Sequence, residues 1–206
     1  MALVKNIIDN NGIKYNDKDF EVLTNGYNKK YLHYIGSGKN VANPKGNTSC
    51  YRMFEDFEGT NLDLSKFNTS EITNMSFMFA NCINLENLDL SNFDTSNVTS
   101  MDCMFCNCIN LKTLDISKFD TENVMYMDNT FWNCENLKEL DISSFYIDNT
   151  KMLDNIFWNC KSLETLKVGS DCLQFFSINR GLLNIENRVN IISMSKLDKA
   201  VNDLFY

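Results

Sequence analysis

The amino-acid sequence contains an internal repeat with a fixed period of 26 residues. The dipeptide Asn-Cys marks each copy, and its cysteines are Cys82, Cys108, Cys134 and Cys160. A phenylalanine stands three residues before each of these cysteines, and a leucine stands three residues after it. A unit this short cannot bury an apolar face by itself, so the copies must pack against their neighbours in one continuous core.

Each copy contains two segments whose apolar residues follow different periods. Val98, Met101, Phe105 and Cys108 are separated by steps of three, four and three, which places them on one face of a helix. Residues 88–91 read Leu-Asp-Leu-Ser, and this alternation predicts a short strand with its leucines on one side. The sequence therefore predicts an α/β fold, a leucine-rich-repeat solenoid with a curved parallel β-ladder backed by short helices and closed by a cap at each end.

A long motif within the repeat resembles a known family. The pattern Met-Phe-x-x-Cys-x-x-Leu-x-x-Leu-Asp-Leu-Ser-x-Phe-Asp-Thr-x-x-Val-x-x-Met runs from Met78 to Met101 and again from Met104 to Met127. It resembles the BspA-like leucine-rich repeats of bacterial surface proteins and mycoplasma-type lipoproteins, over about residues 51 to 169. The resemblance implies a non-enzymatic protein-binding module of the bacterial surface or host-interaction type.

The chain divides into three expected parts. Residues 1–50 lack the repeat and carry the turn signal Asp9-Asn10-Asn11-Gly12, which predicts a β-rich N-terminal cap. Residues 51–169 form the leucine-rich-repeat array, with about four to five units. Residues 170–206 form a C-terminal cap that ends in a helix, because a capping-box-like start at Ser195 precedes apolar residues at helical spacing.

The charge of the chain favours a basic partner. There are 19 basic and 27 acidic residues, for a net charge of −8, which repels nucleic acid and anionic membranes. We therefore expect another protein with a basic surface as the partner, without direct nucleic-acid binding or membrane insertion. The N-terminal residues do not form a secretory signal, and no run of about 18 apolar residues follows, which predicts a cytoplasmic protein as the sequence stands. The family resemblance implies the cell surface instead.

The residues for catalysis or metal binding are sparse. The chain has one histidine, His33, and no nucleophile motif, so we expect no enzyme and no cofactor. Cys103, Cys106 and Cys108 lie too close together on one segment to match the paired loop ligands of a zinc site, so no metal is expected. The four repeat cysteines are predicted to be buried thiols that act as small hydrophobes. Cys50 and Cys172 are either free or bridged.

An acidic column is the first candidate site. Asp63, Asp89, Asp115 and Asp141 occupy the same strand position in successive copies, Glu139 lies beside the last of them, and Lys167 ends the column. If these carboxylates face solvent, they form a stripe that suits lysine or arginine side chains. Alternatively, each aspartate recurs because backbone or Ser/Thr donors hold it for turn geometry.

A group of aromatic residues is the second candidate site. Trp132 and Trp158 occupy the same repeat position, on the predicted far side from the inward-facing residues, so adjacent copies bring the two indoles together near the surface. Exposed tryptophans are typical of interface hot spots, and Tyr126 and Tyr146 add aromatic surface to the same half of the chain. The other explanation is that the indoles pack against each other or against the C-terminal cap.

Two functional hypotheses remain. The chain is a surface or host-interaction binding module, as the resemblance implies. Alternatively, it is an intracellular inhibitor encoded by a phage or mobile element, which binds a basic or nucleic-acid-binding host protein through its acidic and aromatic surface.

Overall fold

The computed structural model describes residues 7–8, 14–15, 20–24, 30–36, 38, 41–43 and 46–194. Two antiparallel pairs lie at the N-terminal end, β1 (Ile7–Ile8) with β2 (Lys14–Tyr15) and β3 (Phe20–Thr24) with β4 (Lys30–Tyr34). The predicted turn at residues 9–12, and the terminal helix predicted from Ser195 onward, lie outside the described residues.

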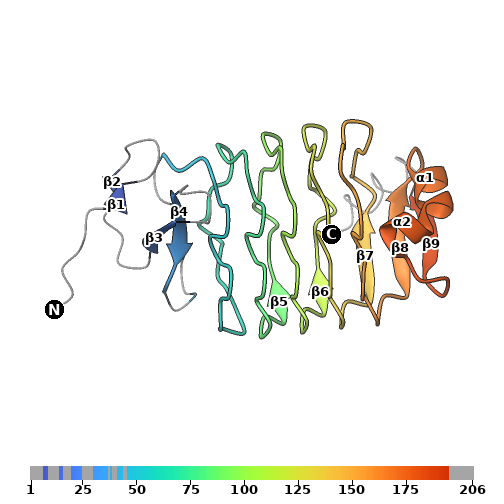
Figure 1. Ribbon diagram of the computed structural model, residues 1–206, viewed down its shortest axis with the longest axis horizontal. Coiled ribbons are helices and arrows are strands. Elements are labelled where there is room, and N and C mark those ends of the chain that lie inside the picture. The colour runs from blue at the N-terminus through green and yellow to red at the C-terminus, as the bar shows by residue number, and fades with distance from the viewer. Residues whose placement is uncertain are drawn as a thin grey trace.

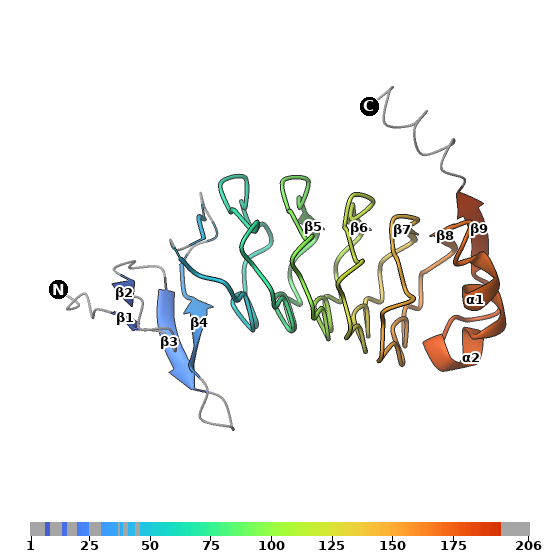
Figure 2. The same cartoon turned by 90° about the horizontal axis from the view of Figure 1, so that it is seen from above.

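Short parallel strands join neighbouring repeats. The strand β5 (Asn87–Leu88) pairs with β6 (Thr113–Leu114), and β7 (Glu139–Ile142) pairs with β8 (Thr165–Gly169), which also pairs with β9 (Asn190–Met194). Between β8 and β9 lie the helices α1 (Leu173–Ile178) and α2 (Arg180–Leu183). Figure 1 shows the successive copies side by side, and Figure 2 shows them between the β3–β4 pair and the α1–α2 pair.

The prediction of a leucine-rich-repeat solenoid with a curved parallel β-ladder backed by short helices is wrong. The described part of the chain has separate sheets of two or three strands instead of one ladder. Its only helices, α1 and α2, follow the repeats and are not part of them. The segment from Val98 to Cys108, which was expected to be helical, consists of turns and one isolated bridge residue, Ser100.

The backbone conformation of this segment explains why no helix forms. Cys103 has a φ of 52° and Asn107 a φ of 60°, and a right-handed helix cannot pass through such left-handed residues. Alternate amide groups bond to the next copy: Cys103 N–H donates to Asp128 O at 2.9 Å, and Phe105 N–H donates to Thr130 O at 2.9 Å. The amides between them close tight turns within the segment, as Cys106 N–H does with Cys103 O at 3.1 Å. The apolar spacing is therefore met by a turn that is hydrogen-bonded to its neighbours.

Aromatic rings form a column through the core. Phe79, Phe105 and Phe131 are stacked nearly parallel, with ring centroids 5.6 Å apart at each step. The column continues through Phe54 and Phe157, and it meets Tyr34 of β4 at one end and Phe176 of α1 at the other. The repeats and the flanking elements thus share one apolar core.

The predicted burial of the repeat cysteines is confirmed, since all four side chains are at most 4% exposed. Each thiol also donates a hydrogen bond to the carbonyl of a phenylalanine in the preceding copy, as Cys108 Sγ does to Phe79 O at 3.1 Å. The corresponding bonds of Cys82, Cys134 and Cys160 span 3.1 to 3.2 Å. A thiol is small enough for this packed position and still supplies a donor.

Candidate functional site

An open groove of about 1030 Å³ runs across the strand side of the repeats. Its floor contains Leu62, Leu88 and Leu114, each 6% exposed. Because side chains alternate along a strand, the residues before and after each leucine point outward and form the walls. These wall residues and their neighbours are Asn61, Asn87, Asp89, Lys112, Thr113, Asp115, Asn136, Lys138, Glu139 and Asp141.

The aspartates of the predicted column hold turns. Asp115 Oδ1 accepts the Ser117 backbone N–H at 3.1 Å and the Ser117 hydroxyl at 2.7 Å. Asp63, Asp89 and Asp141 accept the backbone N–H of the serine two residues later in the same way, at 2.9 to 3.1 Å. The turn-geometry explanation is therefore confirmed. The same residues are nevertheless accessible, because Asp63, Asp89 and Asp115 are exposed and Asp141 is half-buried.

The groove is lined by both acidic and basic side chains. Hydrogen bonds from Ser91 lower the pKa of Asp89, which keeps this carboxyl ionised at neutral pH. Within the described residues, neither Asp89 nor Asp115 takes part in an ion pair. Lys112 pairs with Glu86 of the preceding copy at 2.7 Å, so part of the basic charge is already compensated. The remaining carboxylates are available to a cationic partner.

Lys167 closes the acidic column through an ion pair. Its ammonium group bonds to Glu139 of the neighbouring strand, and it stands in register with Asp141. The hydrogen bond to Glu139 raises the pKa of Lys167, and the charge of Asp141 adds to this effect. Glu139 and Asp141 are thus less available than Asp89 and Asp115.

Asp89, Asp115, Asp141 and Glu139, which were predicted to lie together, all line the groove, but two lysines that also line it were not predicted. Lys112 and Lys138 lie two residues before Leu114 and Leu140, one repeat apart. This regular position is the signal that could have identified them. Asn61 and Asn87 also line the groove, and each directly precedes a leucine of the floor, one repeat apart.

The two predicted tryptophans stack on each other. Their ring centroids are 4.8 Å apart and the rings are 9° from parallel, so the explanation that the indoles pack together is confirmed. Trp158 is still 41% exposed, whereas Trp132 is half-buried. The pair does not line the groove, so the acidic and aromatic candidates are separate surfaces.

The two tyrosines are also placed apart from the groove. Tyr126 is half-buried and forms bridges with Ser100 and Met152. Tyr146 is 44% exposed, and a hydrogen bond to Asp148 raises its pKa. Its backbone N–H bonds to the hydroxyl of Thr121 at 2.7 Å, which fixes the corner on which it stands.

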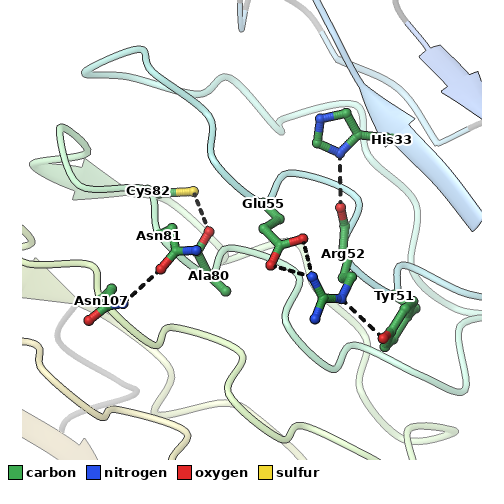
Figure 3. Close-up of polar contacts among 8 residues, drawn as sticks. All are labelled: His33, Tyr51, Arg52, Glu55, Ala80, Asn81, Cys82 and Asn107. Carbon is green, nitrogen blue, oxygen red and sulfur yellow. Dashed lines mark hydrogen bonds and ion pairs between the residues drawn. The ribbon is translucent and has the colours of Figure 1, made fainter. Parts of the chain in front are cut away.

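A polar cluster lies where the N-terminal strands meet the first repeat (Figure 3). Arg52 Nη1 donates to both carboxylate oxygens of Glu55 at 2.7 Å, and Nε donates to the Tyr51 hydroxyl at 3.0 Å. The ring Nδ1 of His33 lies 3.2 Å from Arg52 O. Burial raises the pKa of Glu55, while Arg52 opposes that shift. The cluster joins the β3–β4 pair to the repeats, and its single histidine contacts backbone.

No helix among the described residues is long and apolar enough to cross a membrane. In the same part of the chain, no group of three or more His, Cys, Asp or Glu side chains is arranged to hold a metal ion.

Comparison with known proteins gives one family match. The model of a family described as "Mycoplasma protein of unknown function, DUF285" matches residues 48–168, which is more than half of the chain. No curated protein and no solved structure matches the chain significantly. The match does not address BspA-like leucine-rich repeats, so that resemblance stays a prediction. The chain belongs to the DUF285 family of mycoplasma proteins.

Proposed function

We propose that this chain is a non-enzymatic protein-binding module of the bacterial surface or host-interaction type, and that it holds a basic segment of its partner in the strand-side groove. The observation that carries the proposal is the set of exposed carboxylates Asp89, Asp115 and Glu139, from three successive repeats, along a single groove of about 1030 Å³. Asp89 and Asp115 directly follow the paired strands β5 and β6, about 4.8 Å apart along the repeat direction. Ammonium or guanidinium groups placed along this direction can bridge neighbouring carboxylates.

The local bonding supports a rigid binding surface. The Asx turns fix Oδ1 of Asp115 but leave its Oδ2 for a partner. Because a backbone N–H already holds the carboxylate of each turn, the aspartate side chains lose little conformational freedom when a partner binds. The leucine floor contributes a narrow apolar strip, so charge complementarity governs recognition.

The bonding of the groove residues also supports a role without catalysis. The serines nearest the groove carboxylates donate hydrogen bonds to them, as the Ser117 hydroxyl does to Asp115. No histidine lies beside these serines. His33 lies in the N-terminal cluster, in contact with Arg52 O. An activated nucleophile needs a base within hydrogen-bond reach, and this arrangement does not provide one at the groove.

A defined peptide tests the groove. A fluorescent peptide of alternating lysine and leucine should bind, and its glutamate counterpart should not, as fluorescence anisotropy can measure. Replacing both Asp89 and Asp115 by Asn keeps the turn acceptors but removes two charges, and it should weaken binding at least about fivefold at low salt. The loss should shrink as salt is added, because screening weakens the wild-type attraction.

The matched control replaces Asp94 and Asp120 by Asn. These exposed residues belong to the same two repeats and hold equivalent turns with Ser96 and Glu122, but they lie outside the groove. The control changes net charge by the same amount and should leave affinity within about twofold of wild type. Equal losses in the two variants would assign binding to net charge and would contradict the groove.

A second candidate function is the intracellular inhibitor of a basic or nucleic-acid-binding host protein. All eight cysteines are free thiols, a usage that suits a reducing compartment. The same groove would then hold a basic surface that normally contacts nucleic acid. Fractionation of the native cell separates the two candidates, because recovery in the surface fraction favours the first and recovery in the cytosol favours the second.

A further inference from the structure

Two of the eight cysteines stand apart from the rest. Cys103 and Cys106 are half-buried, whereas each of the other six is at most 8% exposed. The repeat does not require a cysteine at either position, since the preceding copy has Phe77 and Ala80 there and the following copy has Asn129 and Trp132. The stacking of the repeats therefore does not explain this pair, although it does explain the four buried thiols.

The backbone brings Cys103 and Cys106 to the two ends of one tight turn. Cys106 N–H donates to Cys103 O at 3.1 Å. A turn closed in this way holds its end Cα atoms within about 7 Å, and a disulfide needs a Cα separation of about 4.4 to 6.8 Å. The Cys-x-x-Cys spacing thus allows a bond between the two sulfur atoms by side-chain rotation.

Neighbouring copies clamp this turn from both sides. Cys103 N–H bonds to Asp128 O at 2.9 Å in the following copy, and Cys106 O accepts Asn81 N–H at 2.7 Å from the preceding copy. The turn is consequently held in the conformation that keeps its ends close. A preformed geometry favours closure of the dithiol over reaction with a distant cysteine.

The two thiols differ in acidity. A hydrogen bond from Cys103 lowers the pKa of Cys106, and the same interaction, together with burial and the nearby carboxylates Asp102 and Asp128, raises the pKa of Cys103. Burial raises the pKa of the Cys134 and Cys160 thiols in the core. Cys106 is therefore the more nucleophilic member of the pair, and Cys103 is placed to react with it afterwards.

We propose that Cys103 and Cys106 form a reversible intrachain disulfide, with a hydroperoxide as the oxidant. The Cys106 thiolate attacks the terminal oxygen of the hydroperoxide, the O–O bond breaks, and the alcohol leaves after protonation, which gives a sulfenic acid on Cys106. The Cys103 sulfur then attacks the Cys106 sulfur, and the hydroxyl leaves as water with the Cys103 proton. Overall, the two thiols lose two electrons and two protons, and the hydroperoxide becomes one alcohol and one water.

This modification site is distinct from the groove. Neither cysteine lines the groove, and Cys106 occupies the same repeat position as Trp132 of the next copy. The disulfide would therefore form on the aromatic side of the molecule. Its test does not depend on the proposed binding function.

To test the proposal, the reduced protein is treated with hydrogen peroxide at neutral pH. The remaining thiols are then blocked with one alkylating reagent in the native protein and with a second reagent after unfolding. Mass spectrometry maps the products. The expected result is the loss of two hydrogen atoms, a bond located between Cys103 and Cys106, and full reversal by dithiothreitol. A bond located elsewhere, or two freely alkylated thiols at these positions after peroxide treatment, would overturn the proposal. This measurement needs no variant.

Three substitutions assign the roles. Cys103→Ser should leave Cys106 as a sulfenic acid that dimedone traps, and Cys106→Ser should slow the reaction with peroxide at least about tenfold. Cys172→Ala changes a buried cysteine outside the pair and should leave disulfide formation unchanged. Equal peroxide rates for wild type and Cys106→Ser would also overturn the proposal.

Discussion

Single aspartates of this repeat differ in acidity because their surroundings differ. Asp94 is exposed, and hydrogen bonds from Ser96 lower its pKa. Asp102, only a few residues later, is half-buried, and burial with the nearby charge of Asp128 raises its pKa, although it accepts the Asp128 N–H at 3.0 Å. The two side chains should therefore affect the pH dependence of stability in opposite directions.

Asp102→Asn should stabilise the protein at neutral pH. Since the folded-state pKa of Asp102 is raised, its contribution to stability is present below the ordinary carboxyl pKa of about 3.9 and is lost as pH rises through the folded-state value. The amide keeps the acceptor for Asp128 N–H and carries no charge. After allowance for solvent screening, the gain should be on the order of 0.5 kcal/mol at pH 7 and should vanish near pH 3.5. Urea unfolding at several pH values measures it.

Asp94→Asn provides the control with the opposite sign. The folded-state pKa of Asp94 is lowered, so its stabilising contribution is present above the ordinary carboxyl pKa and is lost as pH falls through the folded-state value. The variant should therefore be less stable than wild type at pH 7 and should approach it on acidification. The same pH trend in both variants would contradict the assignment of these environments.

At the scale of the element, the turn that contains each Asn-Cys pair depends on its asparagine. Asn81, Asn107, Asn133 and Asn159 all have left-handed φ values between 59° and 63°. Their amides also form a ladder across the copies, in which Asn107 Nδ2 donates to Asn81 Oδ1 at 2.7 Å (Figure 3) and Asn133 Nδ2 donates to Asn107 Oδ1 at 2.7 Å. Asparagine suits both roles, because it tolerates this conformation and carries a donor and an acceptor.

Asn107→Ala should destabilise the protein by about 2 to 3 kcal/mol. The methyl side chain is strained at a φ of 60°, and both ladder hydrogen bonds are lost. Asn107→Gly loses the ladder but accepts the conformation, so it should retain about 1 kcal/mol more stability than the alanine variant. Denaturant unfolding of the two variants gives the comparison. If alanine proved as good as glycine, backbone strain at this position would be excluded.

Within this element, the sequence predicted which side chains are buried but not the conformation of the backbone. The inward column of Phe105 and Cys108 was correct, because apolar periodicity reports burial whatever the backbone does. The helix was wrong, because the spacing of three and four is also met by a turn with left-handed residues at Cys103 and Asn107. The recurring asparagine was visible in the sequence, but its φ depends on hydrogen bonds to the neighbouring copies. Propensity alone cannot supply such bonds.

Part of the candidate site was predictable, because the repeat places equivalent residues of successive copies on one surface. Repeat register brought Asp89 and Asp115 to one surface, and the structure places both in the groove. The ion pairs of Lys112 with Glu86 and of Lys167 with Glu139 depend on side-chain lengths across copies. The sequence pattern does not determine those pairs, although it does show that Lys112 and Lys138 occupy one repeat position.

At the scale of the whole molecule, the aromatic column joins the repeats to both flanking regions. Tyr34 of β4 lies 5.3 Å from Phe54, and Phe176 of α1 lies 6.5 Å from Phe157, measured between ring centroids. Within the repeats, each ring packs against those of the two neighbouring copies. Loss of one ring therefore weakens contacts on both of its sides, and unfolding should be cooperative along the column.

Phe105→Ala, in the middle of the column, should lower the free energy of unfolding by about 3 to 5 kcal/mol, because it leaves a cavity between two rings. Phe176→Ala, at the end, removes a ring that is 1% exposed and should also shift the entire transition. The measurement is urea unfolding followed both by circular dichroism and by fluorescence of the Trp132–Trp158 pair. Coincident curves in both variants are expected, since one apolar core includes residues from Phe20 to Val189. A separate early transition in Phe176→Ala would show that the C-terminal helices unfold independently, and a loss under about 1 kcal/mol in Phe105→Ala would contradict the continuous column.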